Sequence, residues 1–493
     1  MRIVKTSQLH FGQVDISEIK FDPRSRDDIP AVLKGLQYIY TTENIRERVF
    51  ALLESALPKD INQDTGRPGM ELWKIFVLAT LKLGINSDFD RLQELANSHL
   101  PLRQMLGHSG WEDTYHYKLQ TIIDNVNKLK PSLLADINQV VVEAGHELLK
   151  KKLSDPLIGR CDSFVVETDV HYPTDINLLW DAMRTLITIL GRACQKHNIK
   201  EWRQYCYNIK QLKKLFRKIQ NARHSNSKDP EKKQKRLDEI HQLYRNYLTA
   251  AQYYLTKSER ILEQLMWQSD VATILQIEHY TKHAERQIDH IERRVLKGET
   301  IPHKEKVFSV FEEHTEWVSK GKAGVPVELG VRVCVLEDQH QFILHHRIMW
   351  NETDDMVAVP MIEAAQQRFP ALAQCSFDRG FHSIKNQEEL SKRLETTILP
   401  KKGRLNKEEK ERETSEEFRA ARRQHSAVES CINNLEVRGM NRCLSYGRSG
   451  FERHVGLSIL ACNLHRIGLI LQRKERARLA REKRRLEKIK LAA

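Results

Sequence analysis

The sequence has 493 residues, a mass of 57.7 kDa, a formal net charge of +14 and a pI near 9.2. A chain of this length exceeds one ordinary hydrophobic core, so we expect two or more domains. Its hydrophobic content of 40% and mean hydropathy of -0.56 are typical of a soluble globular protein and exclude a largely membrane-embedded one. The positive charge favours a polyanionic partner.

The eight cysteines are scattered and contain no C-x-x-C pair, which indicates reduced, buried thiols in a reducing compartment and excludes a zinc ribbon. The N-terminus lacks the apolar core of a signal peptide. The longest apolar stretch, residues 72–83, is interrupted by Lys74 and is too short to span a bilayer. We therefore expect a cytoplasmic protein with no membrane partner.

The positive charge is concentrated in two blocks. Residues 210–236 hold 11 Lys or Arg against 2 Asp or Glu, and residues 473–490 hold 10 against 3. Such blocks fit the phosphate backbone of a nucleic acid, where each neutralised phosphate releases counterions. A solvated helical surface explains either block alone about equally well.

Residues 1–150 are predicted to form an all-helical domain that serves DNA binding or, equally well, dimerisation. A turn at residues 66–69 precedes an amphipathic run at 70–83. Further helices are expected at residues 89–96, 121–130 and 133–151.

Strand character begins near residue 158, and residues 151–175 are predicted to be the first part of an α/β core. Residues 161–170 are rich in Val, Phe and Thr, as a strand requires. Residues 174–301 then contain only two Gly and one Pro. This composition predicts a helical insertion at 176–302 whose long helices break at a hairpin tip near residues 225–230.

The core resumes in residues 303–470. Val327, Leu329, Val331, Val333 and Val335 alternate with a period of two and predict a strand. Strands are also expected at 342–350, 371–377 and 396–399, and helices at 354–368 and 385–394. Residues 401–417 are predicted to be a charged, mobile loop before a further helix, and residues 471–493 a basic C-terminal helix or tail. The order of elements is that of an RNase H-like α/β domain with a large helical insertion after its first strand.

Two acidic residues stand out on the predicted strands. Asp162 lies inside a strand with the parity of Phe164 and Val166, where an ionised carboxylate is costly unless it is functional. Asp378 ends a strand just before Arg379-Gly380, where α/β domains place catalytic groups. Asp169 competes for the first role because it lies nearer the strand end. Asp175 competes too, although helix capping explains it.

A third acid lies on a helix. Val428, Cys431, Ile432 and Leu435 form an apolar stripe, and Glu429 stands at its border. By itself it would be an ordinary exposed glutamate. Three carboxylates brought together imply divalent cations that act on a phosphodiester.

These residues lie in segments that together resemble the transposases of bacterial insertion sequences, specifically the ISNCY-like branch of the DDE transposases. The segments are DSFVVETDVHYPTD, SVFEEHTEWVSKGKAGVPVELG, DRGFHS and AVESCINNLEVRGMNRCLSYGRSGFERHVGLSILACNLHRIG. The resemblance covers residues from about 60 to 470, and the order of several motifs carries it.

The resemblance implies an RNase H-like core in which Asp162, Asp378 and Glu429 are the catalytic DDE triad and bind Mg²⁺, with Mn²⁺ as an alternative. It implies cleavage of double-stranded DNA at terminal inverted repeats and strand transfer into target DNA by two-metal phosphoryl transfer. Pairing two element ends favours a homodimer in the synaptic complex.

One departure concerns the surroundings of the glutamate. Related transposases often carry Y-x2-R-x3-E-x6-K, whereas Arg422, His425 and Glu436 stand at those places here. Contacts with terminal phosphates are therefore expected from Arg422, Arg423 or Arg438. Further candidates for DNA backbone contacts, each nearly as well explained as a solvated loop residue, are Lys320, Lys322, Lys401, Lys402 and Arg404.

Two other functions compete. One is an RNase H-like metal-dependent nuclease that cuts DNA without strand transfer, and the other is a decayed transposase that only binds DNA. His279 and His283, four residues apart, suggest zinc, but no third ligand stands at a suitable spacing. Tyr172 and Trp317 are candidates for stacking on unpaired bases, although core packing explains Trp317 better.

Overall fold

The structure is a computed structural model that describes residues 3–6, 8–9, 11–57, 69–109, 113–152, 154–222, 229–319 and 326–492. The strands are β1 (Leu157–Thr168), β2 (Glu316–Ser319), β3 (Val327–Asp338), β4 (Ile343–Met349), β5 (Leu372–Phe377), β6 (Thr396–Ile398) and β7 (Arg442–Cys443). The helices before β2 are α1 (Asp28–Thr41), α2 (Glu43–Ser55), α3 (Leu72–Gly84), α4 (Phe89–Ser98), α5 (Leu100–Met105), α6 (Leu119–Val126), α7 (Pro131–Leu148), α8 (Asp175–Lys196), α9 (Tyr205–Ala222), α10 (Pro230–Gln268) and α11 (Val271–Ile291). The helices after it are α12 (Asp354–Arg368), α13 (Ile384–Arg393), α14 (Lys407–Thr414), α15 (Glu416–His425), α16 (Ala427–Leu435) and α17 (Gly447–Ala492). Short helical turns are η1 (Ile16–Glu18), η2 (Glu292–Leu296), η3 (His303–Glu305), η4 (Arg379–Phe381) and η5 (Glu436–Met440).

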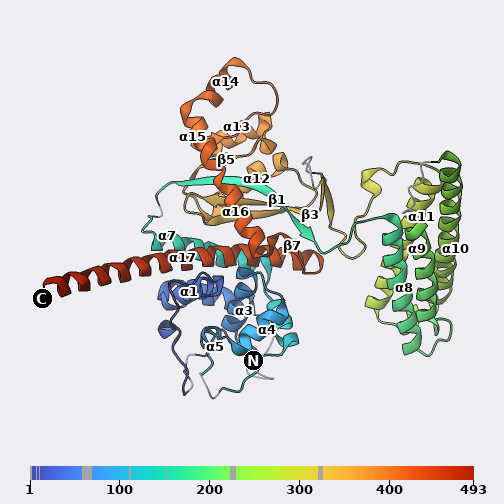
Figure 1. Cartoon of the computed structure of the whole chain (residues 1–493), viewed down its shortest axis with the longest axis horizontal. Coiled ribbons are helices and arrows are strands. Elements are labelled where there is room, and N and C mark those ends of the chain that lie inside the picture. Colours follow the sequence, from blue (N-terminus) through green and yellow to red (C-terminus); the bar gives the residue numbers. More distant parts are fainter. Residues whose placement is uncertain are drawn as a thin grey trace. The chain divides into compact units, whose positions relative to one another are not determined.

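The chain forms two compact units, and the fold class is α/β. The core unit comprises Met1–Asp169 and Val318–Ala493, and the insertion unit is Val170–Trp317 (Figure 1). The insertion unit thus extends beyond the predicted 176–302 at both ends. Residues 1–150 do not separate from the rest of the core unit, because one hydrophobic cluster includes their helices and one face of the sheet.

The sheet is mixed and centres on β1. Strand β3 pairs antiparallel with β1 on one side, and β4 pairs antiparallel with the other edge of β3, which also carries β2. On its other side, β1 pairs in parallel with β5, which pairs in parallel with β6. The short strand β7 runs parallel to the end of β1. The predicted strands of the core are all present within one to four residues of their expected bounds.

Successive side chains of β1 point to opposite faces of the sheet and pack in two different hydrophobic clusters. Cys161 packs with the cluster that contains α7 and α12, whereas Phe164 and Val166 pack with residues of α16 and α17. Helix α17 lies between the sheet and α1 in Figure 1. The backbones of α1 and α17 approach so closely that a Cβ on Gly468 would lie 1.8 Å from the Ala31 carbonyl oxygen. Glycine permits this packing because it has no side chain.

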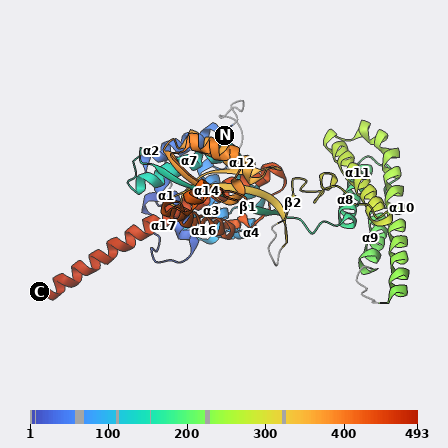
Figure 2. The ribbon, with the colours of Figure 1, turned by 90° about the horizontal axis from the view of Figure 1, so that it is seen from above.

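Helix α17 changes character along its length. By length and composition, its portion Gly447–Ile489 could cross a membrane, but 83% of its most apolar window is buried inside the protein. This is the burial expected of a core helix in a soluble protein. Residues 476–489 are exposed on every side and carry the basic block. Figure 2 shows this end of the helix leaving the rest of the core unit.

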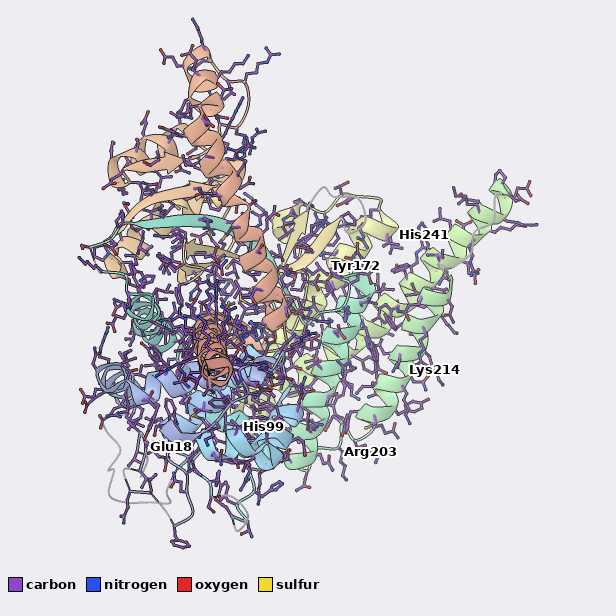
Figure 3. The ribbon with its side chains drawn as sticks, turned by 60° about the vertical axis from the view of Figure 1, so that its left-hand side comes forward. Glu18, His99, Tyr172, Arg203, Lys214 and His241 are labelled. Carbon is purple, nitrogen blue, oxygen red and sulfur yellow. The ribbon has the colours of Figure 1, made fainter. Side chains whose placement is uncertain are left out.

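The insertion unit is a bundle in which α8, α9, α10 and α11 lie side by side (Figure 2). Its separate core includes Leu186, Trp202, Tyr247 and Ile277. The long, nearly glycine-free pattern of the sequence explains these helices. The predicted hairpin tip at 225–230 lies largely outside the described residues. Figure 3 shows Lys214 of the basic block on the outer surface of the bundle, where its side chain is exposed.

Two local predictions are wrong. Most of residues 401–417, predicted as a mobile loop, belong to α14 and the start of α15. Asn406 and Glu409 form a reciprocal capping box that begins α14, and Ser415 caps α15. The run at 70–83 is not amphipathic, because α3 is buried on all sides among α1, α6 and α17.

Candidate active site

Asp162 and Asp378 are placed next to each other by strand register. Cys161 of β1 lies opposite Phe377 of β5 in the parallel pair, so these two aspartates are the next residues on the two strands. Both side chains alternate away from the Cys161–Phe377 face. They therefore face the side of the sheet on which α16 packs. Asp162 is half-buried, and Asp378 is exposed at the point where β5 ends.

Helix α16 brings Glu429 to the same side. Val428, Cys431 and Leu435 are buried, and the last two pack with Phe164 and Val166 of β1. This packing fixes the rotation of α16 and leaves Glu429 exposed at the edge of the contact. A glutamate at that edge can approach carboxylates that project from the sheet.

Electrostatics show that these acids are neighbours. Burial, and after it the charges of Asp378, Asp354 and Glu429, together raise the pKa of Asp162 from 3.8 to about 7. One interaction opposes this rise, because the backbone N–H of Ser163 donates a 2.8 Å hydrogen bond to Asp162 Oδ1. A carboxylate whose ionisation is disfavoured by burial and by nearby like charges is characteristic of sites that bind cations or protons.

Asp354 is a fourth acid that the sequence analysis did not identify. It is the first residue of α12, and its Oδ1 accepts a 2.5 Å hydrogen bond from the Ser163 hydroxyl. Ser163 directly follows Asp162, so this bond ties α12 to the centre of β1. Acidic residues are common in the first turn of a helix, where they interact favourably with the helix dipole. The sequence therefore offered no reason to single out Asp354.

His425 also lies at the site, at the end of α15. Its Nδ1 is 3.0 Å from the Ser376 hydroxyl, and its buried Nε2 has no partner among the residues that the structure describes. Burial lowers the pKa of His425, whereas the carboxylates of Asp378 and Glu429 act to raise it. His425 is therefore a neutral neighbour of the acids.

The donor set fits a hard divalent cation. The carboxylates of Asp162, Asp378 and Glu429 supply oxygen ligands of the kind that Mg²⁺ and Mn²⁺ prefer. In the described part of the chain, two groups of three potential ligand atoms lie within 4.8 Å of one another, and both belong to the insertion unit rather than to these acids. Two cations about 3.5–4 Å apart require acids spread more widely than one ion does. Asp162, Asp378 and Glu429 form no such close group of three, so the structure does not indicate one ion held by all of them.

The two competing aspartates have other partners. Asp169 Oδ1 is 2.5 Å from Arg442 Nη2, so this carboxylate is neutralised beyond the end of β1. Asp175 begins α8 and lies 2.7 Å from Arg294 Nη2 in the insertion unit. Among the three aspartates considered for the first role, Asp162 therefore fits best.

The predicted DNA-contacting residues have different surroundings. Lys402, Arg404, Arg422 and Arg423 are exposed. Both Glu409 carboxylate oxygens lie 2.7 Å from the Lys401 ammonium, so Lys401 is held by the first turn of α14. Lys320 and Lys322 lie outside the described residues.

The prediction that Arg438 contacts DNA is wrong, because this residue is buried, with 4% of its surface exposed. Its guanidinium donates to the Gly84 carbonyl and to Asn434 Oδ1, and lies 3.2 Å from Asp28 Oδ1. These bonds join η5 to helices of the N-terminal region. The guanidinium is occupied in holding the core unit together and is not available to a phosphate.

The two aromatic candidates in the insertion unit line one cavity of about 310 Å³. Tyr172, labelled in Figure 3, is 61% exposed and meets Trp317 edge-on, with ring centroids 5.7 Å apart. Arg294 and Lys306 lie in the same wall. Aromatic faces beside cations suit an unpaired base and its phosphate.

Comparison of the chain with protein-family models, curated proteins and solved structures found no match.

Proposed function

We propose that this protein is a DDE transposase of the bacterial insertion-sequence type, which cleaves DNA at terminal inverted repeats and transfers the ends to target DNA. One observation carries the proposal: β1, β5 and α16 bring Asp162, Asp378 and Glu429 to one side of a single sheet. Three acids far apart in the sequence gain nothing from such proximity unless they share a cation.

The architecture supports an RNase H-like core. Strands β4, β3, β1, β5 and β6 follow one another across the sheet, with β3 antiparallel to both neighbours and the last three strands parallel. This is the order and direction expected of that fold. The insertion unit enters after β1, as the sequence predicts.

Asp162, Asp378 and Glu429 would hold Mg²⁺ or Mn²⁺. A bound pair of such ions supplies nucleophile activation and stabilises the leaving oxygen of a phosphodiester. Asp162 must be ionised to take part, which its raised pKa opposes until a cation binds. Helix α16 fixes Glu429, and Asp354 positions β1 against α12 through Ser163.

The test is a cleavage and joining assay with the purified chain and duplexes that carry the ends of its own element. We expect Mg²⁺-dependent nicking at the repeat ends and joining of pre-cleaved ends to a target plasmid, both abolished by EDTA. Cleavage without joining would identify a nuclease. Binding without either reaction would identify a decayed transposase, and the proposal would then be wrong.

The exposed end of α17 is proposed to contact DNA. Arg481, Arg484, Arg485 and Lys488 gather on one stretch of this helix, and each is exposed. If each contacts one phosphate, we expect their joint replacement by alanine to reduce the slope of log affinity against log salt by about 3.6, since each phosphate contact contributes about 0.9. Fluorescence anisotropy over a salt series measures this slope.

The matched control replaces Arg481, Arg484 and Arg485 by lysine, which keeps the charge and should leave the salt slope nearly unchanged. An unchanged slope in the alanine variant would show that this helix end is only a soluble surface. We further propose that the transposase acts in the bacterial cytoplasm and works as a homodimer when it pairs two element ends.

A further inference from the structure

Two histidines of the insertion unit acquire a third neighbour that the sequence did not reveal. His279 and His283 stand four residues apart on α11, so they share one face of the helix. Glu313 comes from the segment that returns from η3 to β2. One potential ligand atom from each of the three residues lies within 4.8 Å of the others. Proximity of this kind is what a single metal ion requires.

His283 is the buried member of the group, with 3% of its surface exposed. Its Nε2 is hydrogen-bonded to the Glu313 carboxylate, and its ring lies 4.7 Å from that of His279. Its buried Nδ1 has no partner within the described part of the chain. Glu313 is exposed, so an ion can enter from solvent.

The donor set identifies the class of metal. Two imidazoles and one carboxylate are borderline donors that suit Zn²⁺, with ligand distances of about 2.0–2.2 Å. Histidines at i and i+4 on a helix are a common pair of zinc ligands. The acids of the core unit offer only oxygen, so they favour a harder cation.

A second group of three, Asp289, His290 and Glu305, is a weaker candidate. Arg293 Nη1 lies 3.0 Å from Asp289 Oδ2 and 2.6 Å from Glu305 Oε2. The guanidinium therefore already supplies the positive charge that a metal would bring. No such cation pairs with Glu313 among the ion pairs of the described residues, where its partner is His283.

We propose that His279, His283 and Glu313 bind one Zn²⁺, with water completing the coordination. The ion ties the return segment to α11 and so fixes the path of the chain from the bundle toward β2. The site is separate from the proposed catalytic acids and does not depend on the function proposed for them.

The test uses the full-length chain, freed of metal and then titrated with Zn²⁺ or with Co²⁺ as a spectroscopic probe. We expect one Zn²⁺ per chain after dialysis and a visible Co²⁺ absorption of tetrahedral type. Glu313→Gln and His279→Ala should each weaken Zn²⁺ binding by at least about 100-fold, since loss even of an outer partner costs 10–100-fold. Asp162→Asn should leave the Zn²⁺ content unchanged, which separates this site from the core unit.

Two matched controls come from the same unit. Glu305→Gln removes an exposed glutamate from the return segment, and His303→Ala removes an exposed histidine. Both should bind Zn²⁺ like the unaltered chain. Circular dichroism checks that each variant is folded, and the exposed Glu313 provides a variant that does not disturb the bundle core. If the unaltered chain binds no Zn²⁺, or Glu313→Gln binds it equally well, the group is only a His283–Glu313 hydrogen bond and the proposal is wrong.

Discussion

Asp162→Asn is expected to reduce Mg²⁺-dependent DNA cleavage by at least about 1,000-fold, a loss of about 4 kcal/mol of transition-state stabilisation. Asparagine has nearly the same shape but no charge, so it would hold a divalent cation with Asp378 and Glu429 much more weakly. DNA binding should change by less than about twofold because Asp162 is half-buried within the sheet. Single-turnover cleavage and anisotropy measure the two effects separately. Asp378→Asn and Glu429→Gln should behave alike.

The control is Asp169→Asn, which removes an acid from the same part of the chain. Asp169 is paired with Arg442 on the surface, and such exposed pairs contribute at most about 1 kcal/mol. We expect cleavage within about threefold of the unaltered chain. An inactive Asp169 variant together with an active Asp162 variant would move the first ligand to Asp169 and contradict the assignment.

Asp162→Asn should also stabilise the metal-free protein above neutral pH. The pKa of Asp162 is raised in the folded state to about 7 from 3.8. Between these values the folded state holds a proton that the unfolded state has lost, so stability falls as pH rises through this window. Asparagine removes that loss. At pH 8 in EDTA we expect Asp162→Asn to have a higher unfolding temperature and a free energy of unfolding that is larger by a few kcal/mol, on the order of magnitude that the shift implies. Near pH 4 we expect no difference between the two proteins.

Magnesium provides the reciprocal measurement. Adding Mg²⁺ at pH 8 should raise the unfolding temperature of the unaltered chain, because a ligand that binds only the folded state stabilises it. The Asp162 variant should show little of this rise. A residue that lowers stability while it supports activity is characteristic of a functional site. Equal stability of the two proteins at pH 8, with or without Mg²⁺, would contradict the proposed role of Asp162.

Local patterns predicted much of the core unit. Alternation around Val331 and Val333 located β3, and the apolar stripe of α16 placed Glu429 at the border of a buried contact. These predictions succeeded because each depends on a short periodic segment. The helix α14 could also have been found, since Asn406 and Glu409 have the spacing of a capping box. The high charge of residues 401–417 obscured that signal.

Other features required long-range contacts that no local pattern encodes. Asp354 is an ordinary first-turn acid until β1 places Ser163 beside it. Glu313 lies 30 residues from His283 and becomes its neighbour only when the return segment packs on α11. The register that sets Asp162 beside Asp378 likewise depends on a parallel pair, whose strands are joined by a long crossover.

The position of Arg438 also depends on long-range contacts, and its replacement is expected to have a large effect on stability. We expect Arg438→Ala to lower the free energy of unfolding by about 3–5 kcal/mol, the usual cost of removing one partner of a buried charged network. The guanidinium contacts Gly84, Asn434, Asp28 and His465, and alanine would leave the Gly84 carbonyl and Asn434 Oδ1 without this donor and Asp28 with His465 alone. Arg438→Lys should recover only part of the loss, because an ammonium cannot reach all four. Chemical denaturation measures the change.

Arg423→Ala is the matched control, since Arg423 is exposed on α15 and its loss should change stability by less than about 0.5 kcal/mol. In a DNA-binding assay we expect the opposite pattern, in which the loss of Arg423 has the larger effect. If Arg423 contacts a phosphate, its removal weakens binding and lowers the salt slope without affecting the fold. If Arg438→Ala instead kept its full stability and lost DNA affinity, Arg438 would be a surface contact after all. The burial of Arg438 among α1, α3 and α17 predicts the contrary, because a guanidinium that holds helices together cannot also reach DNA.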